Sequence, residues 1–182
     1  MSEATSRLRL FAECGRVDAG LNAQRTAVRP RCARHERAGM RRRGMDVTSL
    51  PFNSFLGLER APPESGFLVS LPGRERYTNH LGTVHASALL AVAEAGSGAF
   101  LVHHIAEASG LLPVVRRLES KFRKPARGRV SARASAKPTE LERALRELGA
   151  RGRALVTVSV EVVDDSGVVA LAAEVEWFIS RT

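Results

Sequence analysis

One glutamate stands alone in an apolar stretch of the chain, and its surroundings suit it to acid–base chemistry. Glu94 is the only ionisable residue between His85 and His103, and its neighbours are mostly Ala, Leu, Val and Gly. Burial in such surroundings disfavours the charged form of a carboxylate and raises its pKa. A glutamate side chain is rarely placed among apolar residues unless it is paired with another group or takes part in the function. Glu94 is therefore a candidate general base or nucleophile, the alternative being a structural carboxylate paired with Ser97 or an arginine.

The polar residues ahead of Glu94 have a spacing that resembles a known signature. Asn79, Gly82 and His85 match the pattern Asn-x-x-Gly-x-x-His-Gly-Gly of hotdog-fold acyl-CoA thioesterases, the group related to hydroxybenzoyl-CoA and phenylacetate-pathway thioesterases. Glu94 falls at the position where the resembling enzymes carry their catalytic acid. The segment 122–128 also resembles the strand and turn that follow the helix in this group. The resemblance implies a hotdog fold and an acyl-CoA or acyl-carrier thioester as substrate.

The chain departs from this pattern directly after His85. The two glycines are replaced by Ala86 and Ser87. In the resembling enzymes the N–H of the first glycine polarises the thioester carbonyl, and Ala86 keeps that N–H. If Ala86 begins a helix, its N–H is an unpaired donor at the positive end of the helix dipole. Such a donor stabilises an oxyanion by roughly 3–4 kcal/mol, so we expect the function to survive the replacement.

The resemblance assigns roles to the other residues of the motif. Glu94 would be the general base or nucleophile, Asn79 would hold the water or the carboxylate, and His85 would shape the loop, enter the helix or contact substrate. Ala86 and Glu94 lie about 12 Å apart along one helix, too far for one site, so the resemblance implies a site shared across a homodimer or tetramer. The further candidates for substrate binding are Gly82, Ser87, Ser97, Arg123 and Lys124, the last two as partners of CoA phosphates or as a solvated strand face.

The elements that must position these residues follow from hydrophobic periodicity. The Ala- and Leu-rich run from Ala86 to about Ile105 predicts one long buried helix, stopped by Gly110 and Pro113. Period-two alternation predicts strands, and turn residues predict a hairpin between the last two. The expected fold is α+β, a curved antiparallel sheet wrapped around the long helix. The predicted strands are 66–71, 117–123, 130–136, 154–162 and 169–179, and short helices are expected at 51–58 and at 139–148, the latter stopped by Gly149.

The basic charge of the chain belongs mainly to its first 44 residues. The 182 residues carry a net charge of +9, and residues 1–44 hold 11 Arg against four acids, which leaves 17 bases and 15 acids beyond them. The expected organisation is a disordered basic tail over 1–44 and one hotdog domain over 45–182, the alternative for the tail being translated sequence upstream of the true start, since Met40 and Met45 could each begin the protein. No aromatic platform accompanies the charge, so we expect no nucleic-acid partner. Cys14 and Cys32 both lie in the tail, so the domain over 45–182 contains no disulfide, which favours a cytoplasmic protein. The two cysteines also lack metal-ligand spacing, so we expect no metal.

Two further functions stay open beside thioester hydrolysis. A hotdog protein could bind an acyl thioester, or only dimerise, without catalysis. A hydratase or dehydratase on the same fold would use His85 with Glu94 for acid–base work.

No secretory signal or membrane-spanning segment is predicted, because the longest apolar run, Ala86–Val102, falls short of the ~20 residues that a bilayer requires.

Overall fold

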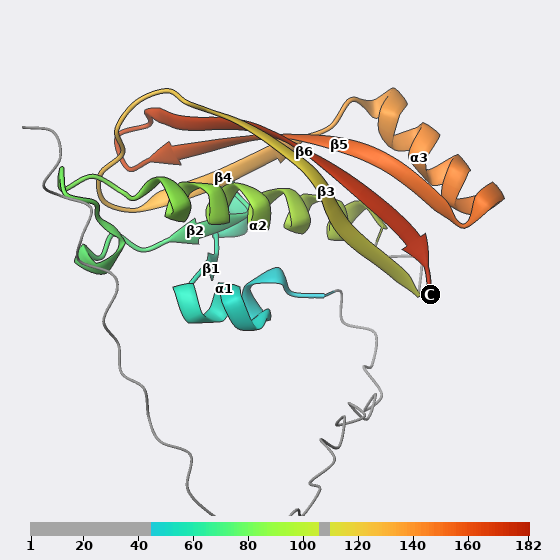
Figure 1. The fold of residues 1–182 in the computed structure, drawn as a ribbon, viewed down its shortest axis with the longest axis horizontal. Coiled ribbons are helices and arrows are strands. Elements are labelled where there is room, and N and C mark those ends of the chain that lie inside the picture. The colour runs from blue at the N-terminus through green and yellow to red at the C-terminus, as the bar shows by residue number, and fades with distance from the viewer. Residues whose placement is uncertain (1–44, 106–109) are drawn as a thin grey trace, which may run out of the picture. The chain divides into compact units, whose positions relative to one another are not determined.

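A computed structural model describes residues 45–105 and 110–182, so the predicted tail over 1–44 lies outside the described residues. These residues form an antiparallel sheet against a long helix (Figure 1). The sheet has the strand order β1-β2-β4-β5-β6-β3, and each neighbouring pair is antiparallel. The elements are η1 (Val47–Ser49), α1 (Pro51–Leu56), β1 (Glu59–Arg60), η2 (Pro63–Ser65), β2 (Val69–Leu71), η3 (Glu75–Tyr77), α2 (Ala86–Ile105), β3 (Leu111–Phe122), β4 (Val130–Ser135), α3 (Pro138–Arg151), β5 (Arg153–Asp164) and β6 (Val169–Arg181).

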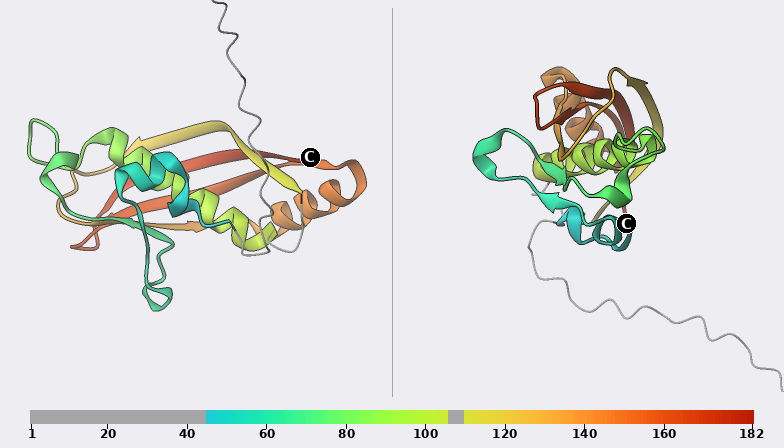
Figure 2. Two further views of the ribbon diagram at one scale, coloured as in Figure 1. Left: turned by 90° about the horizontal axis from the view of Figure 1, so that it is seen from below. Right: turned by 90° about the vertical axis from the view of Figure 1, so that its left-hand side faces the viewer.

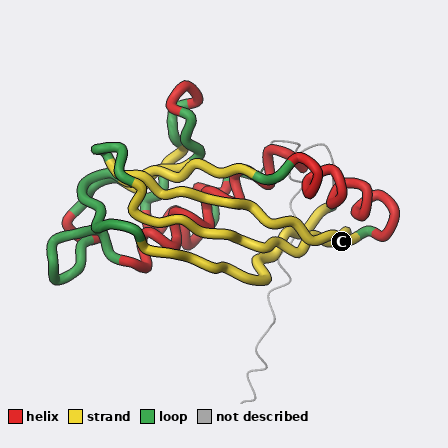
Figure 3. Tube along the Cα trace, turned by 90° about the horizontal axis from the view of Figure 1, so that it is seen from above, coloured by secondary structure: helices red, strands yellow, loops and turns green. Residues whose placement is uncertain are grey.

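The long helix α2 covers one face of the sheet, as predicted. In Figure 1 it runs beneath the strands of the sheet, in the left view of Figure 2 it lies in front of them, and Figure 3 shows the strands crossing over it. The inward stripes predicted for the last two strands are confirmed, because their alternate residues are buried. The core is filled by Val156, Val158, Val160, Val162, Leu171, Val175 and Ile179 from the sheet and Leu89, Val92 and Leu101 from α2.

A glycine allows α2 to approach the sheet closely. A Cβ built on Gly96 would lie 2.5 Å from the Cβ of Ala132 on β4, closer than real carbon contacts allow. Small residues at the crossing therefore set the distance between helix and sheet. By length and composition α2 could also span a membrane, but 56% of its most apolar window is buried. This burial fits the core helix of a folded domain.

The edge strand β3 differs from its prediction. It begins at Leu111 rather than near Arg117, and Pro113 lies inside it. Proline lacks a backbone donor, and an edge strand tolerates it because one side of the strand has no ladder partner. The pairing with β6 shifts between Val115 and Arg117, which leaves Arg116 as an additional residue in the strand. Periodicity after Arg117 therefore identified only the second half of the strand.

The ends of two other elements were also predicted wrongly. Helix α3 continues past Gly149 to Arg151 and ends at Gly152, whose φ of 68° supplies the left-handed cap. Strand β2 covers only Val69–Leu71 of the predicted 66–71, because Gly66 follows the turn η2 with φ 74°. The two-residue strand β1 was not predicted, since a segment so short has no measurable period.

The N-terminal segment holds together through one buried asparagine. The Nδ2 group of Asn53 in α1 donates to the carbonyl of Val47 in η1 at 2.9 Å, and Asn53 is 3% exposed. The helix predicted over 51–58 is confirmed but ends at Leu56, and its Phe52 and Phe55 are 63% and 80% exposed. Figures 1 and 2 show α1 on the side of α2 that faces away from the sheet.

Candidate active site

Asn79 organises the loop that leads into α2. Its Oδ1 accepts hydrogen bonds from the backbone N–H groups of Leu81 and Thr83 at 2.9 and 3.2 Å, and its Nδ2 donates to the Thr83 hydroxyl at 3.0 Å. Gly82 turns the loop with φ 67° and its carbonyl accepts from Arg127 at 3.1 Å. In this chain the carboxamide of Asn79 therefore holds the loop. Its predicted role in holding the water or the carboxylate stays a prediction.

His85 joins this loop to the helix. Its N–H donates to the Tyr77 carbonyl at 2.7 Å, and its ring Nδ1 accepts from the backbone N–H of Ser87 at 3.1 Å. The imidazole therefore caps the helix in the manner of an N-cap side chain. An accepting Nδ1 in a neutral imidazole leaves the proton on Nε2. The helix-entry interpretation of His85 is confirmed, and its exposed ring still leaves Nε2–H available to a substrate.

Ala86 presents a free backbone donor. It is the first residue of α2 and is exposed, and its N–H has no acceptor within the residues that the structure describes. Helix geometry leaves this N–H unpaired at the positive end of the dipole. This is the arrangement that an oxyanion donor requires.

A small cavity beside Ala86 brings several predicted residues together. It has a volume of about 290 Å³, and its lining includes Asn79, Ala86, Arg123 and Lys124. The two basic residues follow β3, where both backbone N–H groups donate to the carbonyl of Ala170 at 2.7 and 3.4 Å. The loop, the free N–H and two cations therefore meet at one end of α2. This end of the helix can hold a thioester carbonyl next to an anionic group.

Glu94 lies apart from that cavity, two turns further along α2. It lines an apolar cavity of about 460 Å³ that shares no residue with the first. Burial raises the pKa of its carboxyl group above the ordinary glutamate value. Across residues 45–105 and 110–182, its carboxylate takes part in no hydrogen bond or ion pair. The structural alternative, in which an arginine or Ser97 pairs with this carboxylate, is therefore not supported.

The Ser97 hydroxyl is bonded to groups other than the Glu94 carboxylate. Its hydroxyl donates to the main-chain carbonyl of Glu94 at 2.7 Å and accepts from the indole Nε1 of Trp177 at 3.1 Å. The residue is fully buried, so its hydroxyl supports Trp177 within this chain. Its predicted contact with substrate stays a prediction, as does that of the exposed Ser87.

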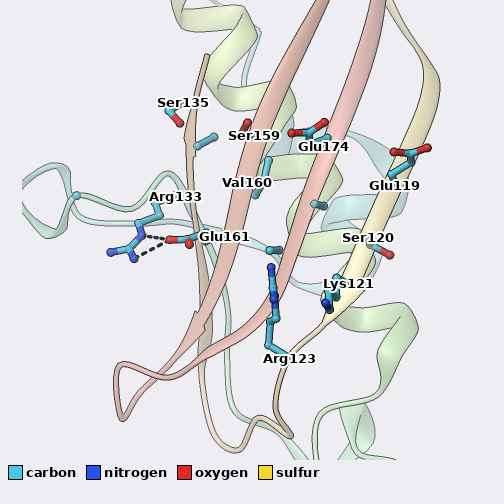
Figure 4. Close-up of a pocket in the computed structure, with 14 residues that line it drawn as sticks. Glu119, Ser120, Lys121, Arg123, Arg133, Ser135, Ser159, Val160, Glu161 and Glu174 are labelled. Atoms are coloured by element: carbon cyan, nitrogen blue, oxygen red, sulfur yellow. Dashed lines mark hydrogen bonds and ion pairs between the residues drawn. The ribbon is translucent and has the colours of Figure 1, made fainter. Parts of the chain in front are cut away.

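A hollow larger than either of these two cavities lies elsewhere in the described part of the chain. It has a volume of about 880 Å³, and its lining comes from β3, β4, β5 and β6. Figure 4 shows the ion pair of Arg133 with Glu161 on its wall and Glu119 beside Glu174 on neighbouring strands. Of the predicted site residues only Arg123 reaches it. Size alone therefore does not mark the site of chemistry.

Sequence reasoning missed the residues around Glu94. Trp177 falls within the strand predicted over 169–179 but was not assigned to a site, and no motif singled out Val47, Leu50 or Leu101, which line the same cavity. Their shared feature is only that they are apolar, which also describes the core. Residues 45–105 and 110–182 contain no cluster of three or more His, Cys, Asp or Glu side chains placed to hold a metal ion.

Comparisons with known proteins identify the family of this chain. The family described as "Domain of unknown function (DUF4442)" matches residues 64–179, and the chain belongs to this family. No curated protein matches the sequence significantly.

Several solved structures share the hotdog fold of the thioesterase superfamily, which confirms the predicted fold. A Pseudomonas aeruginosa protein described as a probable thioesterase superposes with a TM-score of 0.62 at 23% identity, covering 75% of this chain and 91% of its own. A point mutant of the phenylacetic acid degradation protein PaaI from Thermus thermophilus gives 0.50 at 25% identity over 71% and 98%. A Bacillus halodurans protein solved with CoA gives 0.50 at 20% identity over 61% and 65%.

Proposed function

We propose that this protein hydrolyses an acyl-CoA or acyl-carrier thioester, with Glu94 as general base or nucleophile. The observation that carries the proposal is the state of Glu94. Its carboxylate has no partner among the described residues, lines an apolar cavity and has a pKa raised by burial. A carboxylate whose pKa is raised by burial is a stronger base than an ordinary glutamate, which suits it to take a proton from water. The similarity to thioesterase-superfamily structures supports the same reaction.

The reaction needs few parts beyond this carboxylate. With Glu94 as base, it takes a proton from water while the water oxygen bonds to the thioester carbon, and the carbonyl oxygen becomes an oxyanion. The N–H of Ala86 stabilises that oxyanion. Collapse of the intermediate breaks the C–S bond, and the proton on Glu94 passes to the departing thiolate. No cofactor is needed for these steps.

The site requires a second copy of the chain. Ala86 and Glu94 are about 12 Å apart along α2 and line separate cavities. Among the described residues, the edge strand β3 is paired only with β6, which leaves its other side open to a partner. We propose a homodimer, or a tetramer of dimers, in which one subunit supplies Ala86 and the other Glu94.

The remaining parts of the proposal concern the substrate and its surroundings. Arg123 and Lys124 lie beside Ala86, where they could bind the phosphates of CoA. The CoA in the structure of the Bacillus halodurans protein supports this choice of carrier. Because 45–182 contains no cysteine, we further propose a cytoplasmic setting. The 17 bases and 15 acids of this segment nearly balance, and we propose neither nucleic acid nor a membrane as partner.

Replacement of Glu94 tests the proposal directly. Purified full-length protein is screened against a panel of acyl-CoAs by release of free thiol, beside Glu94→Gln and Glu94→Asp. We expect Glu94→Gln to reduce turnover at least ~100-fold and Glu94→Asp to retain partial activity, because its carboxylate is present but displaced. Circular dichroism and sizing check that each variant is folded.

Two results would overturn the assignment. Parental turnover in a folded Glu94→Gln variant would make Glu94 a structural carboxylate. Hydration of an enoyl-CoA in place of hydrolysis would favour the hydratase alternative.

A further inference from the structure

The cavity beside Glu94 has the composition of a pocket for an apolar group. Its volume of about 460 Å³ lies within the range typical of small-molecule sites. Apart from Glu94 and Asn53, every lining side chain is apolar or glycine, with no cation among them. The walls come from three places in the chain, namely the N-terminal segment (Val47, Leu50), α2 (Leu101, Val102) and the sheet (Val115, Trp177).

We propose that this cavity is the acyl pocket and that it admits an uncharged, apolar acyl group while rejecting one that ends in a carboxylate. This inference rests on the proposed function. An acyl group that enters here places its carbonyl carbon beside Glu94, with the CoA moiety directed to the partner subunit. A second carboxylate inside the pocket would be desolvated without a cation to pair it, and it would lie near Glu94.

One wall of the pocket is held rigid by a buried chain of hydrogen bonds. The indole N–H of Trp177 donates to Ser97, and the Ser97 hydroxyl donates to the main-chain carbonyl of Glu94. Trp177 is 6% exposed and Ser97 fully buried. The same turn of α2 therefore carries the reacting carboxylate and fixes the indole, which holds the pocket wall at a set distance from Glu94.

Gly98 determines how much room the pocket offers. A Cβ built on Gly98 would lie 3.5 Å from the Trp177 ring and 3.7 Å from the side chain of Val47. These are ordinary contact distances, so alanine fits without a clash and occupies space between the indole and the N-terminal segment. We infer that Gly98 and Trp177 determine the size of the acyl group that is accepted.

The chain carries its own probe of this pocket. Trp177 is the only tryptophan in the 182 residues, so its fluorescence reports what enters the cavity. The parent protein is titrated with octanamide, which resembles the acyl end of a thioester but is not a thioester, and with the monoamide of octanedioic acid. We expect a saturable change with octanamide and binding at least ~10-fold weaker for the monoamide, because burying its unpaired carboxylate is costly.

A matched pair of variants tests the role of Gly98. Gly98→Ala and Gly149→Ala each replace a helical glycine by alanine, but a Cβ at Gly149 meets nothing within 4 Å. We expect Gly98→Ala to lower the ratio of kcat/KM for octanoyl-CoA to that for acetyl-CoA at least ~10-fold, the effect of one methyl group in a tight pocket. Gly149→Ala should keep the parental ratio.

The two readouts separate this inference from the proposed function. Saturable octanamide binding without hydrolysis of any acyl-CoA would support the acyl pocket and contradict the proposed thioesterase activity. Hydrolysis with no fluorescence change for octanamide, or with equal binding of the carboxylate-bearing monoamide, would keep the activity and overturn the pocket. The titrations use the parent protein, so they decide the matter even if Gly98→Ala does not fold.

Discussion

The two ends of the functional stretch of α2 differ in how they are built. At Ala86 the helix starts in an exposed loop whose polar groups are tied by Asn79 and His85, and the free group is a backbone N–H. At Glu94 the surroundings are apolar, and the free group is a carboxylate. A backbone donor keeps its polarity at any pH, whereas the partly buried carboxylate changes its charge with pH. The helix thus offers a fixed electrostatic element at one end and a titrating one two turns later.

Removal of the backbone N–H at Ala86 should have the largest effect on turnover. Proline is tolerated at the first helical position and lacks an N–H, so Ala86→Pro deletes the proposed oxyanion donor and little else. We expect kcat for acyl-CoA hydrolysis to fall ~100- to 1000-fold, with KM changed far less. Steady-state kinetics measure this loss, and Ala86→Gly, which keeps the donor, is the matched control. Equal activity of the proline and glycine variants would show that this N–H takes no part.

Dimers that combine an Ala86 variant with a Glu94 variant test whether Ala86 of one subunit and Glu94 of the other form one site. Ala86→Pro and Glu94→Gln chains are unfolded together in denaturant and refolded at a one-to-one ratio. If each site takes one end from each subunit, half of the dimers are mixed and each has one intact site, so about a quarter of the parental activity should return. Thiol release after refolding measures it, with each variant refolded alone as control. No recovery, despite mixed dimers by mass spectrometry, would place both ends in one subunit's site.

Elements with a regular pattern of burial, and loops with a recognisable motif, could be predicted from the sequence. The stripes of β5 and β6 and the span of α2 were predictable because burial on one face imposes a period. The loop residues around Asn79 were found through a motif, since turns and caps demand particular residue types. The edge strand β3 was only half predicted, because its proline and its additional residue at Arg116 interrupt the period.

The apolar cavity beside Glu94 could not have been predicted in the same way. Its walls come from segments as distant in sequence as Val47 and Trp177, and an apolar lining has the same composition as a core. The link from Trp177 through Ser97 to the Glu94 carbonyl depends on the register of β6 against α2. Only the lone carboxylate itself was a usable signal, because its isolation among apolar residues is visible in the sequence.

The titrating end should control the pH dependence of activity. Burial raises the pKa of Glu94, and its role as base or nucleophile requires the ionised form. Activity should therefore fall as pH drops through a pKa that lies above the ordinary glutamate range of about 4.3. Profiles of kcat/KM against pH measure this acid limb. A limb at or below the ordinary value in the parent protein would contradict a desolvated Glu94 as the catalytic group.

The smallest predicted effect of Glu94→Gln is on the free energy of unfolding, and its sign follows from the raised pKa of Glu94. A carboxyl group whose pKa is raised on folding binds its proton more tightly in the native state, so folding is favoured at low pH. This contribution is lost as pH rises from the unfolded-state pKa of Glu94 through its higher folded-state pKa. Solvent screening keeps the free-energy change small, because the carboxyl group is only partly buried. Glu94→Gln cannot lose a proton, so the variant should become more stable relative to the parent as pH rises. Urea unfolding at several pH values measures the difference. A constant difference across that range would mean that Glu94 has the same pKa in the folded and unfolded chain.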